Sequence, residues 1–153
     1  MELSSIIQPP GIRLLTAVSS KKRLFQDIGE LAEVAHGIPS QQAVDALMER
    51  ESLGPTGVGK GIALPHARLP RLTQVAGVFV RLDKPIDFDA ADKKPVDLVF
   101  ALFAPVESGV DHLKALALVS RTLRDTAVQA KLRSNVDAPT LHVVLTETAA
   151  EAA

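Results

Sequence analysis

Residues 75–82, VAGVFVRL, and residues 96–104, VDLVFALFA, are two apolar runs rich in valine, leucine and phenylalanine. Their apolar character is nearly continuous, which is typical of strands covered on both faces rather than on one. The runs therefore predict two central strands of a sheet. The acidic, proline-bounded segment 83–95 between them is expected to be an exposed connection.

Helical patterns lie on either side of these strands in the sequence. Residues 20–36 place apolar side chains at helical spacing, with Ser20 as the expected N-cap, Gly37 as the expected stop and Lys21 on the wetter face. A second helix is expected from residue 40 to Gly54, and further helices at 109–124, with Ser108 as N-cap, at 126–133 and at 139–145. The apolar stripes assigned to the core are Val44, Leu47 and Met48 in the second helix and Leu113, Leu116 and Leu123 in the third.

This order of helices, strands and helices predicts an α/β fold. The chain shows no internal repeat and no linker, so we expect a single layered domain over residues 1–153 with a frayed tail from about residue 147. We expect no fused second domain.

Composition excludes several classes of function. The 17 Lys and Arg residues are balanced by 18 Asp and Glu residues, so no positive field favours nucleic acid. The absence of cysteine excludes disulfides, thiolate metal sites and a cysteine nucleophile. The N-terminal segment is unlike a signal peptide, and no apolar run approaches the roughly 18 residues that span a bilayer, so we expect a cytoplasmic protein without membrane insertion.

A glycine-rich segment, GPTGVGKGIALPHAR, occupies residues 54–68. Its closely spaced glycines disfavour a helix and predict a loop shaped by its backbone, followed by a short strand at residues 62–64 that Pro65 ends. His66 is then expected at the exit of that strand.

His66 is the residue in this segment that suits group transfer. A neutral imidazole is a good nucleophile toward phosphorus, and its ordinary pKa keeps much of it unprotonated near neutral pH. Backbone amides of the loop at Gly57, Val58 and Gly59, with the hydroxyl group of Thr56, are candidates to hold a phosphate, although the spacing matches neither a P-loop nor a dinucleotide fingerprint. Taken alone, the glycines indicate only a tight turn. Taken alone, His66 is equally consistent with a structural histidine that is hydrogen-bonded to a carbonyl oxygen.

The segment TGVGKGIALPHAR resembles the active-site segment of the enzyme IIA proteins of the bacterial phosphotransferase system, fructose/mannitol type, in which the Pro-His dipeptide carries the phosphorylated histidine. Arg50 and Glu51, followed by TGVG at 56–59, match the family pattern R-E-x-x-x-x-T-G-(I/V)-G. His112 begins HLKALA, which matches a second family segment, H-L-x-x-L-A. The early SSKKRLFQDIGELA is similar to the first helix of the nitrogen-regulatory subgroup, whereas Pro55 and Lys60 stand where Ser and Asn are common.

The resemblance implies a fold and a set of roles. It implies a mixed central β-sheet flanked by α-helices on both faces, with His66 as phosphoryl acceptor, His112 as its support and Arg50 neutralising the phosphate. It further implies a phosphotransferase component that receives its phosphoryl group from a phosphocarrier protein of the HPr kind, with no metal and no organic cofactor. Turnover of a small molecule by this chain alone is not expected.

Three alternatives remain open beside a nitrogen or metabolic regulator. The chain is a candidate for a sugar-specific enzyme IIA that passes the phosphoryl group to an enzyme IIB, or for an interaction module that is not phosphorylated. A metal-dependent hydrolase using His66 and His112 ranks last, since no HExxH motif accompanies them. The downstream acceptor or regulated partner and the oligomeric state are not predicted.

Overall fold

Strands β5 (Ala76–Ile86) and β6 (Val96–Pro105) pair antiparallel at the centre of the sheet, as the two apolar runs predict. The computed structural model describes residues 1–107 and 109–152, with side chains described through residue 147. The remaining strands are β1 (Ile12–Leu15), β2 (Gly57–Gly59), β3 (Ile62–Ala63) and β4 (His66–Leu69). They give the order β1-β5-β6-β3-β2, with β4 also paired to β6. Parallel and antiparallel pairs both occur, so the sheet is mixed.

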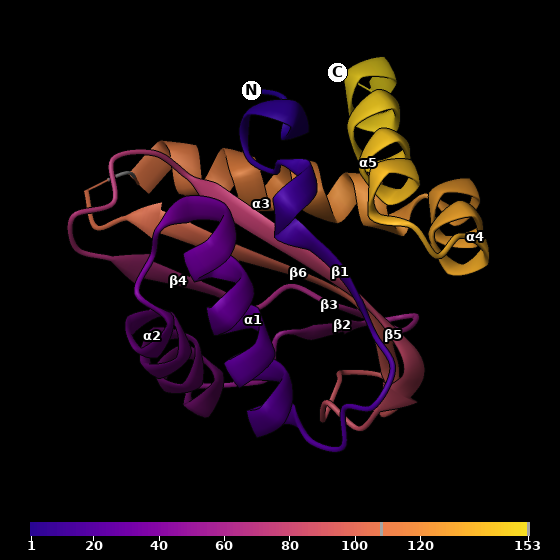
Figure 1. Cartoon of the computed structure of the whole chain (residues 1–153), viewed down its shortest axis with the longest axis horizontal. Coiled ribbons are helices and arrows are strands. Elements are labelled where there is room, and N and C mark those ends of the chain that lie inside the picture. Colours follow the sequence, from indigo (N-terminus) through magenta and orange to yellow (C-terminus); the bar gives the residue numbers. More distant parts are fainter. Residues whose placement is uncertain (108, 153) are drawn as a thin grey trace.

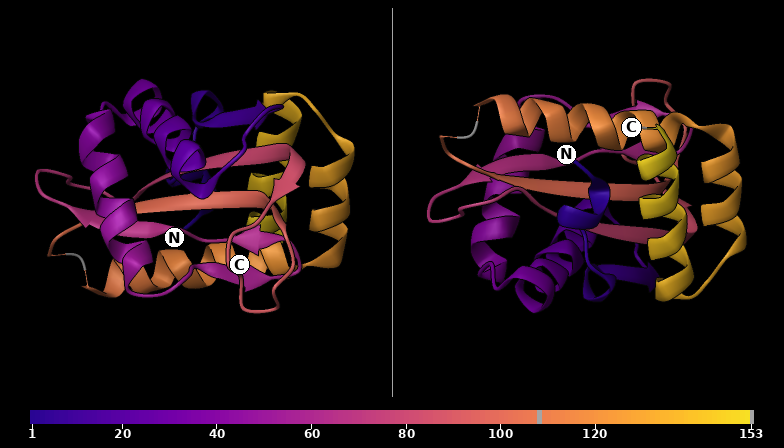
Figure 2. Two further views of the ribbon diagram at one scale, coloured as in Figure 1. Left: turned by 90° about the horizontal axis from the view of Figure 1, so that it is seen from below. Right: turned by 90° about the horizontal axis from the view of Figure 1, so that it is seen from above.

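Helices cover both faces of this sheet (Figures 1 and 2). They are α1 (Lys21–His36), α2 (Ser40–Ser52), α3 (Gly109–Arg124), α4 (Thr126–Ser134) and α5 (Ala138–Ala152), with short 3-10 turns η1 (Leu3–Ser5) and η2 (Pro9–Gly11) near the N-terminus. Alternate residues of β6 point to opposite faces: Val99 packs with the residues of α1 and α2, and Phe100 with those of α3 to α5. The predicted α/β fold with helices on both faces is confirmed.

The ends of α1 follow from its sequence. The Ser20 hydroxyl oxygen accepts a hydrogen bond from the backbone N–H of Arg23 at 3.1 Å, and Gly37 ends the helix in the left-handed region with φ of 71°. The expected N-cap of α3, Ser108, lies outside the described residues.

The buried faces of α2 and α3 differ from the predicted stripes. Ala43 and Leu47 of α2 are buried, whereas Met48 is exposed. In α3 the buried face contains Ala115 and Val119, and Leu113 is 66% exposed. Leu47 and Leu123 of the predicted stripes are buried as expected, so the predicted and observed buried faces overlap without being the same.

The connection between β5 and β6 is less exposed than the sequence suggests. Strand β5 continues to Ile86, and the Phe88 ring is fully buried with its centroid 5.9 Å from that of Phe25. One buried aromatic side chain thus anchors an otherwise polar segment. At the other end of the chain, α5 extends to Ala152, and fraying from about residue 147 stays a prediction.

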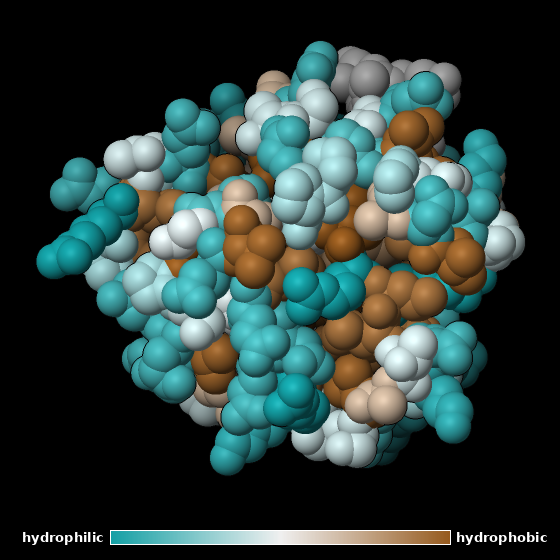
Figure 3. Space-filling view, viewed as in Figure 1, coloured by the Kyte–Doolittle hydropathy of each residue, from teal (hydrophilic) through white to brown (hydrophobic). Residues whose placement is uncertain are grey.

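Strand β1 forms one edge of the sheet. Figure 1 places β1 near the centre of the face shown in Figure 3, and apolar side chains reach the surface there. Leu14 and Leu15 of this strand are half-buried.

Across residues 1–107 and 109–152, no helix combines the length and the apolar character needed to cross a bilayer.

Candidate functional site

The segment before His66 forms a hairpin and a strand rather than a loop. Strands β2 and β3 pair antiparallel around a turn at Lys60 and Gly61, whose φ angles of 59° and 81° suit a two-residue type I′ turn. The short strand expected at residues 62–64 is β3, which ends before Pro65 as predicted. The Pro65 carbonyl accepts a hydrogen bond from the Leu102 N–H at 2.9 Å, and His66 then begins a further strand, β4, that the sequence did not predict.

The His66 ring is held in one tautomer by its own backbone. Its Nδ1 lies 2.8 Å from the carbonyl oxygen of Leu64. A carbonyl oxygen only accepts hydrogen bonds, so Nδ1 carries the proton and the lone pair lies on Nε2. The ring is half-buried, and the structure thus orients the nitrogen that is able to attack an electrophile.

His112 packs edge to face against His66. The ring centroids are 5.5 Å apart at an interplanar angle of 76°, and His112 is 6% exposed in the first turn of α3. Among the described residues, neither ring nitrogen of His112 has a hydrogen-bond partner. Burial lowers the pKa of His112, and electrostatic interactions with His66 and Arg68 lower it further, so the ring is neutral at neutral pH. It offers one unpaired donor and one unpaired acceptor.

Arg50 lies in the last turn of α2. Its Nη1 donates to the Gly54 carbonyl oxygen at 2.9 Å, which fixes the guanidinium group at the end of the helix. Arg50, His66 and His112 line one pocket of about 410 Å³. The three catalytic residues predicted from sequence are thereby brought together from α2, β4 and α3. The other residues lining this pocket are Ala46, Glu49, Leu53, Ala67 and Arg68.

The predicted phosphate loop lies apart from this pocket. Gly57 packs so closely on Ala90 that an added Cβ would lie 2.7 Å from the Ala90 Cβ, and a Cβ on Gly59 would lie 3.4 Å from a carboxylate oxygen of Asp92. Val58 is half exposed, and none of residues 56–59 is among those that line the pocket. Their contact with phosphate stays a prediction, and the hairpin explains why they point elsewhere.

Thr56 is engaged by a carboxylate that the sequence analysis gave no role. Its N–H and its hydroxyl donate to Glu51 at 2.9 and 2.6 Å. Lys21 pairs with the same carboxylate at 2.7 Å and lies over the Phe88 ring at 4.4 Å, so its assignment to a solvated face was wrong. This network joins α1, α2 and β2 directly beside Arg50. Only the adjacency of Arg50 and Glu51 in the family pattern hinted at it.

Arg68 is the pocket cation that sequence reasoning missed. It follows His66 by two residues on β4, and residues two apart on a strand share one side. That spacing was the available signal, but it is informative only once residues 66–69 are known to form a strand.

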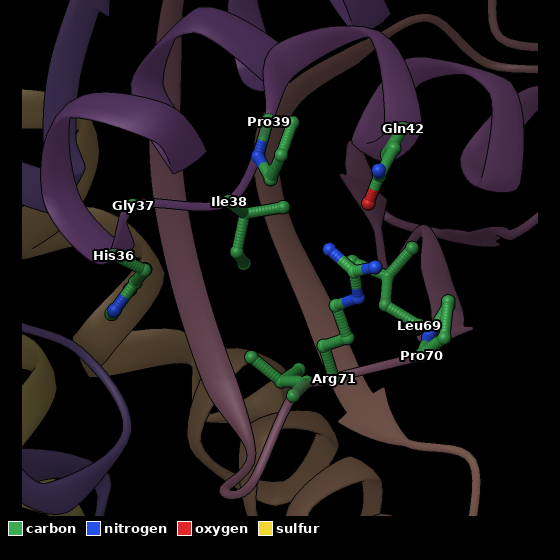
Figure 4. Close-up of a pocket in the computed structure, with 9 residues that line it drawn as sticks. His36, Gly37, Ile38, Pro39, Gln42, Leu69, Pro70 and Arg71 are labelled. Carbon is green, nitrogen blue, oxygen red and sulfur yellow. The ribbon is translucent and has the colours of Figure 1, made fainter.

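A second pocket, of about 300 Å³, lies between the α1–α2 connection and the end of β4 (Figure 4). The guanidinium group of Arg71 lies between Ile38 and Gln42, and the ring of His36 lies apart from them. His36 is tied through Nε2 to the Gly77 carbonyl oxygen at 2.8 Å, and His142 through Nε2 to that of Ile7 at 3.1 Å. Both histidines thus have structural partners, in contrast to His112.

Metal chemistry finds no support in the described part of the chain. No group of three or more His, Cys, Asp or Glu side chains able to hold a metal ion occurs there. A pair of histidines alone falls short of the ligand number of a zinc site.

Comparison with known proteins connects this geometry to a family. The family model described as the phosphoenolpyruvate-dependent sugar phosphotransferase system, EIIA 2, matches residues 5–147. A nitrogen regulatory protein of Bradyrhizobium diazoefficiens is 43% identical over 145 residues, which cover 95% of each chain. The crystal structure of the nitrogen regulatory protein IIA-Ntr from Neisseria meningitidis superposes with a TM-score of 0.86 at 34% identity, covering 94% of this chain and 99% of that one.

The likeness extends to a more distant protein in complex. The Escherichia coli mannitol enzyme IIA, solved together with phosphorylated mannitol enzyme IIB, gives a TM-score of 0.75 at 20% identity, covering 91% of this chain and 96% of that one. At this identity the likeness shows the fold alone.

Proposed function

Because the chain belongs to the EIIA 2 family of the phosphoenolpyruvate-dependent sugar phosphotransferase system, we propose that it carries a phosphoryl group on Nε2 of His66. The family is a phosphotransferase component, so a role in phosphoryl transfer follows from membership. The observation that supports His66 as the acceptor is its hydrogen bond from Nδ1 to the Leu64 carbonyl, which leaves the Nε2 lone pair free.

The transfer reaction needs no proton transfer at His66. The Nε2 lone pair attacks phosphorus in line, and the electron pair of the donor's breaking P–N bond returns to the donor imidazole. The Nδ1 proton stays on the hydrogen bond to Leu64, whose carbonyl stabilises the positive charge that develops on the ring. The product ring, bonded to phosphorus at Nε2 and still protonated at Nδ1, carries a formal positive charge beside the dianionic phosphoryl group.

Arg50 and His112 stabilise the phosphoryl oxygens in this proposal. A guanidinium group pairs with phosphate through a planar fork, and the Arg50 bond to Gly54 holds the group in place before the phosphate arrives. His112 is buried, neutral and without a partner among the described residues, so its N–H is available to a phosphoryl oxygen.

The rim of the pocket suits a protein donor. Leu53, which lines the pocket, is 82% exposed, and Val106, Val110 and Leu113 are also exposed on the segment around His112. Exposed aliphatic side chains around a charged centre are typical of protein interaction sites. We assign this rim to a phosphocarrier protein of the HPr kind as donor, and to a regulatory target or an enzyme IIB as acceptor.

A regulatory role is favoured over sugar uptake. The relative from Bradyrhizobium and the structure from Neisseria are both described as nitrogen regulatory proteins, at 43% and 34% identity. Phosphorylation adds negative charge beside an exposed apolar rim, which changes the affinity for partners. In this proposal the chain acts in the cytoplasm as a single domain whose phosphorylation state is the signal. Passage of the phosphoryl group to an enzyme IIB is the second candidate.

Incubation with a phosphorylated HPr-type protein tests the proposal. Intact-mass spectrometry should show one added phosphoryl group on the wild-type chain and none on His66→Ala, and acid should remove the group, as expected for phosphohistidine. The variant His142→Ala serves as a control and should be loaded normally. Loading of His66→Ala would contradict the assignment, and a wild-type chain that is never loaded would favour an interaction module.

A further inference from the structure

Arg68 shares a side of β4 with His66. The burial of this strand alternates, with Ala67 and Leu69 buried, His66 half-buried and Arg68 exposed. Both His66 and Arg68 line the 410 Å³ pocket. The charge of Arg68 is also near enough to His112 to contribute to its lowered pKa, after burial and the electrostatic interaction with His66.

Arg68 is held in the same manner as Arg50. Nη1 of Arg50 donates to the carbonyl of Gly54 at 2.9 Å, and Nη1 of Arg68 donates to that of Val106 at 3.1 Å. Each guanidinium group has five N–H donors, and within the described residues its remaining donors have no partner. Each backbone carbonyl therefore fixes one edge of a fork and leaves the rest of the fork available.

The charge of the pocket is not neutralised internally. Neither Arg50 nor Arg68 forms an ion pair with a described residue, and Glu49 is the acidic side chain among the lining residues. Two fixed cations against one carboxylate leave an excess of positive charge, which suits a dianion.

We propose that Arg68 binds the phosphoryl group on His66 directly and forms, with Arg50, the second arm of an arginine clamp. The assignment rests on the proposed function of His66. It deepens that function, because the second arm lies on the same strand as the nucleophile. The bond to Val106 keeps the arm in position while the other donors of the guanidinium group bind phosphoryl oxygens.

The clamp makes a kinetic prediction. Arg68→Gln should lower the rate of loading by an HPr-type donor at saturating donor concentration about tenfold, the loss of one charge-assisted hydrogen bond at a solvent-exposed site. Arg68→Lys retains the positive charge but lacks the planar fork of the guanidinium group, so its loading rate should lie between those of Arg68→Gln and the wild type. Arg71→Gln removes an exposed arginine three residues farther along, in the second pocket, and is the matched control with an unchanged rate.

Each outcome of this experiment either supports or overturns the clamp. A fall in kcat in Arg68→Gln, with melting temperature within about 2 °C of the wild type and partial rescue by Arg68→Lys, supports the clamp. A raised KM with unchanged kcat would place Arg68 on the donor-docking rim, and an unchanged rate would leave it a structural anchor for Val106; both overturn the clamp while the role of His66 stands. A wild-type chain that is not loaded at all would overturn the proposed function and the clamp together.

Discussion

Replacing Glu51 tests how the structure holds the site together. Glu51 is 6% exposed and accepts three hydrogen bonds, from the N–H of Thr56, from its hydroxyl and from the ammonium group of Lys21. Glu51→Ala leaves all three donors without this acceptor. Breaking a buried charge pair costs about 3–5 kcal/mol, and we expect the lower value because the Lys21 side chain is 24% exposed.

Glu51→Gln should cost much less. An amide oxygen replaces Oε2, which accepts from Thr56 N–H and Lys21, and the amide nitrogen then donates to the Thr56 hydroxyl after that group rotates. The hydrogen bonds persist and only the charge is lost, at about 1 kcal/mol. With a shift of about 2–4 °C per kcal/mol for a chain of this size, melting temperatures should fall by about 6–12 °C in the alanine variant and about 2–4 °C in the glutamine variant.

Urea denaturation followed by circular dichroism gives the free energies of unfolding, with Glu30→Ala as control for loss of an exposed acidic residue on α1. The control should stay within about 0.5 kcal/mol of the wild type. An equal loss of the free energy of unfolding in Glu51→Ala and Glu51→Gln, or a Glu51→Ala variant as stable as Glu30→Ala, would refute the reasoning.

Four further predictions follow from single contacts. Lys60→Asn should raise the free energy of unfolding by about 1 kcal/mol in urea denaturation, because asparagine tolerates the left-handed backbone that Lys60 adopts at φ of 59°; an unchanged value would argue against the type I′ turn. Gly77→Ala should cost about 1–3 kcal/mol in the same assay, since a Cβ there would lie 2.6 Å from Cε1 of Phe100; a neutral substitution would mean that β5 and β6 pack more loosely than described. Burial first, and then electrostatic interactions with His66 and Arg68, lower the pKa of folded His112 below its ordinary 6.5, so the unfolded chain binds a proton more readily and stability should fall as pH drops below about 6.5; thermal melts across this range should show a weaker fall in His112→Gln, and an identical slope would contradict a buried neutral ring. Arg50→Lys keeps the charge but loses the fork, and stopped-flow loading from an HPr-type donor should slow about tenfold; a rate equal to the wild type would exclude a bidentate contact.

The central strands could be predicted from sequence because burial on both faces leaves a local trace. Alternate residues of β6, such as Val99 and Phe100, enter two different cores, so no polar face interrupts the run. The helical stripes were predicted less well. Leu113 carries the same local signal as a core leucine, and only packing against the sheet decides that Ala115 and Val119 face inward.

The sequence offered the candidate reacting groups of the pocket, but it did not predict the contacts that hold them. His66 and Arg50 belong to family motifs that can be recognised directly in the sequence. The Lys21–Glu51 pair joins residues thirty positions apart, which no periodicity reveals, and Arg68 acquires its place only when β4 pairs with β6. The contact between His66 and His112 likewise depends on the parallel pairing of β4 with β6, which sets His66 opposite Leu102. Because β6 leads into α3, this pairing places His66 near the start of the helix that carries His112.

Nitrogen-15 NMR of the histidine-labelled chain, before and after loading from a phosphorylated HPr-type protein, tests the central claim most directly. The account predicts a proton on Nδ1 of His66 in the free chain and a phosphorus coupling on Nε2 of the same ring in the loaded one, with His112 neutral in both. Coupling at Nδ1 of His66, or on any other histidine, would contradict it.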